Sequence, residues 1–200
     1  MPVQSSVHFY LNWAKERLDE MNATLAVLDG QIAKMQADMR AKAQQYVAEL
    51  RAKRDEFDGA LKKQGQAGEA AWESAKTGLE AEWKKFQHVL KEYTETVGKH
   101  MEQQQAVFRS QVEAQLKAWR ETADQLNAAA KTFAQESRRE VDAAIVQMKT
   151  DATVAEQRLA KLTQARTESW SALSTALTET RASFDRANQA AHDAFRRAVG

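Results

Sequence analysis

The chain has 200 residues, with 29 lysines and arginines against 28 aspartates and glutamates and a formal net charge of +1. It holds 7 glycines and 1 proline, where an average chain of this length would have about 14 and about 10. With so few turn-forming residues, the composition excludes a β-sandwich, a barrel or an α/β sheet. The absence of cysteine excludes disulfides and cysteine-ligated metal centres. The balanced charge also lacks the positive surplus that is typical of polyanion-binding proteins.

The first predicted element is a helix over residues 6–63. Larger apolar residues recur in it at three- and four-residue steps: Leu18, Met21, Leu25, Leu28, Ile32, Met35, Met39, Tyr46, Leu50, Phe57 and Leu61. Up to Tyr46 this is a heptad seam, which buries a narrow stripe against one partner helix. Lys42 and Arg54 stand near the seam, where their methylenes can lie along it while the charges stay in water.

A turn is predicted at 64–68, where Gly65 and Gly68 form the only close pair of glycines. Lys62 and Lys63 suit the end of the preceding helix, because cations are stabilised near a helix C-terminus.

The second predicted helix begins near residue 69. Its seam residues are Trp72, Ala75, Leu79, Trp83, Phe86, Leu90, Tyr93, Val97, Met101, Phe108, Val112, Leu116, Trp119, Ala123, Leu126, Ala130, Phe133, Val141, Ile145, Met148, Ala152, Ala155, Leu159 and Leu162. This in-phase pattern favours one unbroken helix to about residue 162, which would be a three-helix elongated rod of about 140 Å. The alternative breaks at Gly98 and forms a compact four-helix bundle of two repeated hairpins. Either arrangement is all-α and built of long antiparallel coiled-coil helices.

A second turn is predicted at 163–167 and a final helix at 168–198. The reason is an internal repeat at an offset of 98 residues, with pseudo-repeats of about 6–100 and 104–198 in a single domain covering 1–200. The offset pairs Leu61 with Leu159 and Trp72 with Trp170. Each tryptophan follows its leucine across a predicted turn, so we expect Trp72 and Trp170 to close the hairpin tips. Trp13 lies off the seam and should matter less.

The stretch 26–93 resembles a stress-response family of small bacterial coiled-coil proteins first named in cyanobacteria. Those proteins are single helical hairpins with an Ala-Trp-x-x-x-Lys-x-Gly pattern, here 71–78, and a second tryptophan on the return arm, here Trp83. The second repeat carries Arg181 at the place of that second tryptophan. The resemblance covers about a third of the chain. It implies a bacterial, cytoplasmic, stress-associated helical protein and no catalytic residues.

No catalytic, cofactor-binding or metal-binding residues are predicted, and we do not expect an enzyme. The sequence has no Glu-x-x-His motif, nucleophile elbow or glycine-rich loop after a strand. His88 and Glu92 stand at i, i+4, which is interpreted as part of a solvated helix face. The methionines at seam positions, including Met35 and Met39, are interpreted as core gap-fillers and not as metal ligands.

The basic residues form short groups: Arg51/Lys53/Arg54, Lys62/Lys63, Lys84/Lys85, Arg138/Arg139 and Arg196/Arg197. Acids stand near each of them, so they are interpreted as charges that set helix pairing and solubility, and nucleic acid is not an expected partner.

The expected function is that of a non-catalytic structural or interaction protein that self-associates or binds partner helices. Self-association is expected through alanine-rich and aromatic flanks that include Ala37, Ala41, Phe9 and Tyr10. The N-terminus has no apolar run long enough for a signal peptide, and no run approaches a membrane span, so cytoplasmic residence is expected. The alternative is an amphipathic protein that coats a membrane or storage-granule surface, as phasin-like proteins do.

Overall fold

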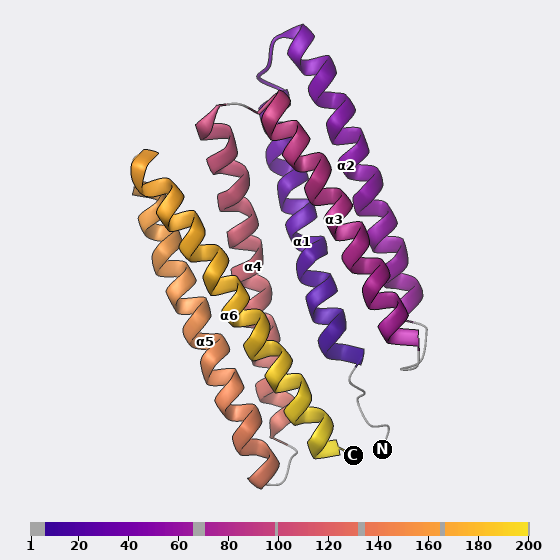
Figure 1. Ribbon diagram of the computed structural model, residues 1–200, viewed down its shortest axis with the longest axis vertical. Coiled ribbons are helices and arrows are strands. Elements are labelled where there is room, and N and C mark those ends of the chain that lie inside the picture. The colour runs from indigo at the N-terminus through magenta and orange to yellow at the C-terminus, as the bar shows by residue number, and fades with distance from the viewer. Residues whose placement is uncertain (1–6, 66–70, 99, 132–134, 165–166, 200) are drawn as a thin grey trace. The chain divides into compact units, whose positions relative to one another are not determined.

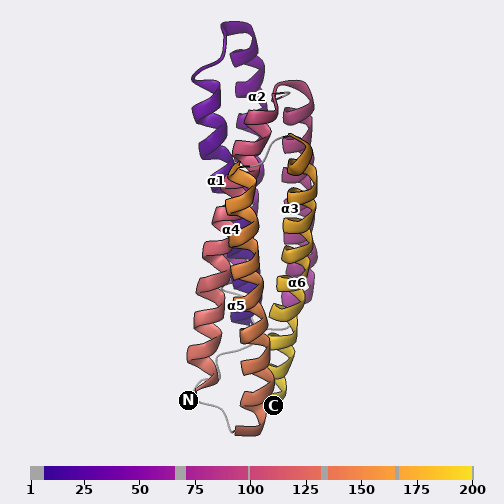
Figure 2. The ribbon, with the colours of Figure 1, turned by 90° about the vertical axis from the view of Figure 1, so that its left-hand side faces the viewer.

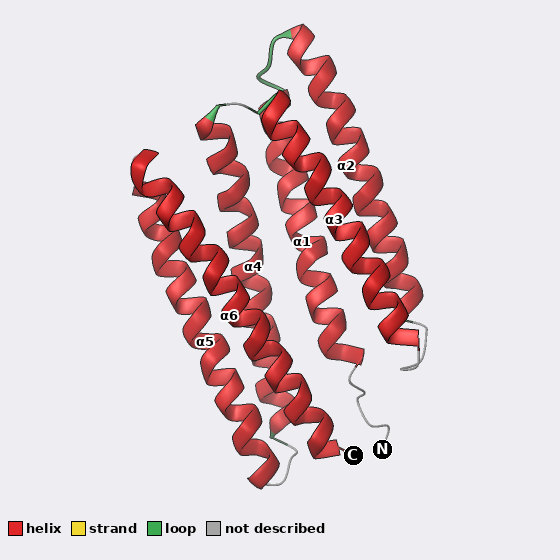
Figure 3. Cartoon of the chain, in the orientation of Figure 1, coloured by secondary structure: helices red, strands yellow, loops and turns green. Residues whose placement is uncertain are grey.

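Six helices make up the described part of the chain, in a computed structural model that covers residues 7–65, 71–98, 100–131, 135–164 and 167–199. They are α1 (Val7–Ile32), α2 (Ala37–Gln64), α3 (Trp72–Thr96), α4 (Met101–Ala130), α5 (Gln135–Gln164) and α6 (Thr167–Val199). Every regular element in these ranges is a helix, which confirms the all-α prediction (Figure 3).

The contacts divide the chain into two compact units. One contains residues 13–115, and the other contains residues 1–12 and 116–200; we call them the 13–115 unit and the 116–200 unit. Consecutive helices within each unit run in opposite directions (Figure 1). In the first unit α2 and α3 pair along their length, and in the second α5 and α6 lie side by side as an antiparallel hairpin (Figure 2).

The predicted helix over 6–63 is wrong in one respect, because it is interrupted at 33–36. Gln36 has extended backbone angles of φ −67° and ψ 157°. The carbonyl of Met35 accepts a bond of 2.7 Å from Arg40 Nη2, which helps to satisfy the break. This segment has neither glycine nor proline. The break therefore has no local cause, and we attribute it to packing: folding back lets α1 bury several of its faces instead of one.

The unbroken helix expected between 69 and 162 is also wrong. The chain leaves helical geometry after Thr96 and again after Ala130, so three helices occupy this span. The interruption after Thr96 includes Gly98, which is where the four-helix-bundle alternative placed a break. A β-carbon at Gly98 would lie 3.1 Å from Cε1 of Tyr93, so the ring occupies the space that a side chain would need. Neither arrangement predicted the second interruption, of which residues 132–134 lie outside the described residues.

The two predicted turns are where the long hairpins reverse. α2 ends at Gln64 and α3 begins at Trp72, while α5 ends at Gln164 and α6 begins at Thr167. Residues 66–70 and 165–166, which fall in or beside these turns, lie outside the described residues. The final helix agrees with its prediction of 168–198 to one residue at each end.

The apolar seams form the core, as predicted, most completely in α5. Its buried side chains include Val141, Ile145, Met148, Ala152, Ala155, Leu159 and Leu162. The seam fails around the interruption at 33–36, where Met35 lies outside any helix and Met39 is 42% exposed. The gap-filler interpretation therefore holds for Met21 and Met148, which are fully buried, and not for Met39.

The 98-residue repeat remains a prediction, with which two pairs of helix ends are compatible. Ile32 and Ala130 end α1 and α4, and Ala37 and Gln135 begin α2 and α5, at the predicted offset in both cases. The side chains of Trp72 and Trp170, which were expected to close the hairpin tips, lie outside the described residues.

Candidate interaction surface

A small hollow lies between α4 and α5 in the 116–200 unit. It has a volume of about 260 Å³, with Trp119, Ala123, Met148 and Ala152 among its lining residues. Ligand pockets usually measure about 300–1,000 Å³. The hollow exists because alanines face each other across the two helices and leave room that larger side chains would fill.

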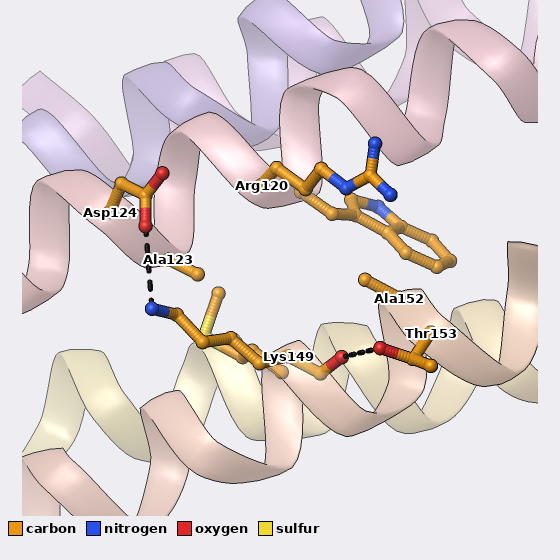
Figure 4. A pocket seen from close by; sticks show the side chains of 8 residues that line it. Arg120, Ala123, Asp124, Lys149, Ala152 and Thr153 are labelled. Carbon is orange, nitrogen blue, oxygen red and sulfur yellow. Dashed lines mark hydrogen bonds and ion pairs between the residues drawn. The ribbon is translucent and has the colours of Figure 1, made fainter.

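Charged side chains rim this hollow and already have partners (Figure 4). Lys149 Nζ reaches across to the Asp124 carboxylate at 3.4 Å, and Arg120 pairs with Glu156. All four side chains are more than a third exposed, so solvent screens both ion pairs. The hollow offers no desolvated carboxylate or free cation to a substrate, and it does not resemble an active site.

A buried ionic cluster in the 13–115 unit was not predicted from the sequence. Arg17 Nη1 donates to the carboxylates of Glu16 and Glu20 at 2.7 Å each, and all three side chains are at most 6% exposed. The guanidinium carbon also lies 5.3 Å from the ring centroid of Trp13 and 5.5 Å from that of Trp83. Trp13 is therefore half-buried against a cation and is not an isolated surface residue.

The cluster was missed because charged residues on an amphipathic helix normally occupy the solvent face. The only local signal was the position of the two glutamates. Glu16 directly precedes Arg17, and Glu20 directly precedes Met21 of the seam.

Polar side chains also enter the seam between α5 and α6. Asp151, 7% exposed, accepts bonds from Ser183 Oγ at 3.0 Å and from Gln147 Nε2 at 3.0 Å. One heptad further along α5, Arg158 donates to the carbonyl of Ala176 and the hydroxyl of Thr180. Two polar partners at fixed positions disfavour a heptad slip of the hairpin, because a slip would leave Asp151 without its hydroxyl.

Each predicted basic group has at least one member with an acidic partner, as that interpretation expected. The pairs are Arg51 with Asp29, Lys53 with Glu56, Lys62 with Asp58, Lys85 with Glu82, Arg138 with Asp142 and Arg197 with Glu140. The hydrogen bond from Lys53, followed by one with Glu82, lowers the pKa of Glu56 below its usual value. The hydrogen bond to Glu82 raises the pKa of Lys85.

The histidine and metal interpretations can be placed on the described residues. His88 Nε2 lies 3.7 Å from Glu92 Oε1, with both side chains about half or more exposed, so the pair does lie on a solvated face. Within the described ranges no group of three or more His, Cys, Asp or Glu side chains has the arrangement of a metal site. None of the helices, over the residues searched, is both long and apolar enough to cross a membrane.

The outer face of α5 has an unusual composition. Six exposed residues on it follow alternating three- and four-residue steps without a charge: Ala143, Val146, Thr150, Thr153, Gln157 and Ala160. We call this set the α5 outer stripe. Val146 is 64% exposed, the most of any large apolar side chain in the described residues.

The hydroxyls of the two threonines in this stripe bond to the backbone of their own helix. Thr150 Oγ1 donates to the carbonyl of Val146 at 2.9 Å, and Thr153 Oγ1 donates to that of Lys149 at 3.0 Å. Because both hydroxyls are satisfied by their own helix, neither requires a partner from solvent. The stripe thus has the spacing and chemistry of a second, weakly apolar coiled-coil seam, opposite the buried one.

The corresponding face of α2, at the predicted 98-residue offset, differs. Its residues are Gln45, Ala48, Ala52, Asp55, Gly59 and Lys62. Two charges and a glycine interrupt it, so an uncharged outer stripe is a property of α5 and not of both hairpins.

No protein-family model, curated protein or solved structure matches this chain.

Proposed function

We propose that this protein is a non-catalytic helical scaffold that self-associates by pairing the α5 outer stripe with the same stripe of a second copy. The cytoplasmic location and the stress association belong to this proposal and rest on the resemblance described above. An enzymatic role is not part of it, since the buried carboxylates of Glu16, Glu20 and Asp151 are engaged by hydrogen bonds within the fold.

One observation carries the proposal: the six residues of the α5 outer stripe combine heptad spacing, absence of charge and exposure to solvent. Exposed helix faces of soluble proteins are usually polar or charged, and single exposed apolar residues need no explanation. A sustained three–four spacing is different, because it is the pattern by which two helices pack knobs into holes.

The size of the stripe sets the expected affinity. From Ala143 to Ala160 it spans about 26 Å of helix, and its side chains are small. A single helix pair of that length falls at the low end of protein interfaces, which corresponds to a weak or transient association. We expect a monomer at low micromolar concentration and a dimer at several hundred micromolar.

Sedimentation velocity over that concentration range tests the proposal with a matched pair of variants. Val146→Glu places a charge in the α5 outer stripe, whereas Ala48→Glu places one at the corresponding exposed position of α2. The first should abolish concentration-dependent sedimentation and the second should leave it unchanged. A wild-type protein that stays monomeric throughout, or a dimer that both variants weaken equally, would contradict pairing through α5.

The second candidate function is coating of a membrane or granule surface, and the aromatic face of α3 favours it. Trp83, Phe86 and Tyr93 occupy one buried face of this helix. Amphipathic helices with such faces bind lipid interfaces when the faces become accessible. In the closed form, Met39 and Val146 are the only large apolar side chains exposed among the described residues, so binding requires a unit to open.

Flotation with anionic liposomes distinguishes the two functions. Co-flotation together with a blue shift of tryptophan emission supports surface coating. Absence of both, in a protein that dimerises at high concentration, supports the scaffold.

A further inference from the structure

The helix α2 buries fewer apolar side chains than α5, the helix at the corresponding place in the predicted repeat. Over its 28 residues it buries only Ala43, Val47, Leu50 and Phe57. The corresponding helix α5, with 30 residues, buries Val141, Ala144, Ile145, Met148, Ala152, Ala155, Leu159 and Leu162, in addition to Asp151. The larger buried residues of α2 are thus three, against five in α5.

The polar links from α2 to α1 are exposed. Arg51 pairs with Asp29 of α1 at 2.5 Å, with both side chains nearly half exposed. Arg54 Nη1 donates to Asn22 Oδ1 at 2.8 Å, also in an exposed setting. Such surface contacts contribute little to stability because solvent screens them and the long side chains lose conformational freedom.

At one end of α2 the contact with α3 is aromatic. The rings of Tyr46 and Tyr93 meet edge to face with centroids 6.2 Å apart, and Tyr46 Oη donates to Thr96 Oγ1 at 3.4 Å. Tyr46 is half-buried, while Tyr93 is only 1% exposed. Separation of α2 from α3 would therefore uncover Tyr93.

The ends of α2 and one position inside it also favour its detachment. The 33–36 interruption precedes it, and Gly65 ends it. Gly59, inside the helix, has no heavy atom within 4 Å of the place where a β-carbon would lie. A glycine in a helix interior weakens the helix and, here, adds no packing.

We infer that α2 is a detachable arm, which lifts from the 13–115 unit while α1 and α3 stay folded. Partial opening of this kind is expected where few apolar side chains secure an element and most of its remaining contacts are exposed. The lifting of α2 does not depend on either proposed function. If surface coating is correct, the lifted arm is the step that uncovers Tyr93 of the aromatic face.

Thiol labelling tests the inference, because the chain has no cysteine of its own. Leu50→Cys in α2 and Met148→Cys in α5 replace two side chains that are both fully buried and stand at corresponding positions. Met21→Cys, also at a fully buried position, reports on α1. Each is exposed to excess thiol reagent under native conditions, and the labelling rate reports how often that position opens.

We expect Leu50→Cys to react at least about tenfold faster than Met148→Cys or Met21→Cys. Each large apolar side chain that an element lacks changes its opening equilibrium by about that factor. Adding Phe57→Ala should speed the Leu50→Cys reaction further and leave the Met21→Cys rate unchanged. Equal rates at positions 50 and 148, or an equal effect of Phe57→Ala at positions 50 and 21, would overturn the inference.

Hydrogen exchange of the unmodified protein provides an independent readout that needs no substitution. Amides of α2 should exchange faster than those of α1, α3 and α5. Protection of α2 equal to that of α1 would show that the unit opens only as a whole and would also overturn the inference.

Discussion

Arg17 of α1 and Trp83 of α3 are joined by a cation–π contact, in which the guanidinium carbon lies 5.5 Å from the ring centroid. The arginine is 3% exposed and the tryptophan 8% exposed. Glu16 and Glu20 bond to the same guanidinium, so a group of three charges is held inside the 13–115 unit. Buried charges are tolerated when they are paired, and they become costly when one partner is removed.

The substitution Arg17→Met should therefore lower the free energy of unfolding by about 3–5 kcal/mol, measured by urea denaturation. The reason is that the substitution removes the guanidinium, which bonds to the buried carboxylates of Glu16 and Glu20. The triple variant Glu16→Gln, Arg17→Met, Glu20→Gln should recover most of this loss. As a control, Arg51→Met removes an exposed ion pair and should cost less than about 1 kcal/mol. If Arg17→Met costs no more than Arg51→Met, the cluster is not buried as described.

The stacked pair Trp119 and Phe184 should anchor the 116–200 unit. Their ring centroids are 4.2 Å apart at an interplanar angle of 11°, and they are 2% and 1% exposed. Each change to alanine should cost about 3–5 kcal/mol, and a double-mutant cycle should give a coupling of about 0.5–1.5 kcal/mol. Val146→Ala serves as the control, because this exposed site should change stability by less than about 0.5 kcal/mol. Additive effects of the two aromatic substitutions would argue against the stacked contact.

Two glycine substitutions should have opposite signs. Gly98→Ala should destabilise the protein by about 1–3 kcal/mol, because its β-carbon would press on the Tyr93 ring in a packed region. Gly30→Ala should stabilise it by about 0.5–1 kcal/mol, since Gly30 lies in α1 with nothing within 4 Å of a β-carbon. Thermal unfolding of both variants measures the difference. A stabilising Gly98→Ala would show that the tyrosine ring does not fill this space.

The hydroxyl of Tyr93 should cause a loss of stability at high pH. It is buried and has no hydrogen-bond partner among the described residues, and its burial raises the pKa of Tyr93 above the ordinary value of 10.0. Above that value the unfolded chain releases this proton while the folded chain retains it, so unfolding becomes more favourable as pH rises. The contribution is fully present below the unfolded pKa and is lost as pH rises through the folded one.

Tyr93→Phe isolates this contribution in urea unfolding at about pH 8 and at about pH 11, on either side of the usual tyrosine pKa. The variant should be as stable as the wild type or more so at the lower pH, because it removes an unpaired buried hydroxyl. It should also lose less stability than the wild type between the two values. Identical losses in both proteins would mean that Tyr93 does not titrate as its burial requires.

The sequence by itself determined the fold class and the apolar faces of the helices. In α5, the predicted seam residues from Val141 to Leu162 are buried without exception. The hairpin reversals after Gln64 and Gln164 were also predicted, the first from a pair of glycines and the second from the repeat. These features follow from local rules. The 3.6-residue period decides which side chains share a face, and glycine marks where a helix can end at little energetic cost.

Only the tertiary structure decided where else the chain folds back, what enters the core and what remains outside. The interruption at 33–36 has no breaking residue, and a heptad seam reads the same whether its helix continues or turns back against itself. Arg17 is buried and lies against Trp83 of another helix, whereas Met39 is exposed just after the interruption. The α5 outer stripe was equally hidden from a search for seams, since one helix can carry two such faces and only packing shows which of them is already covered.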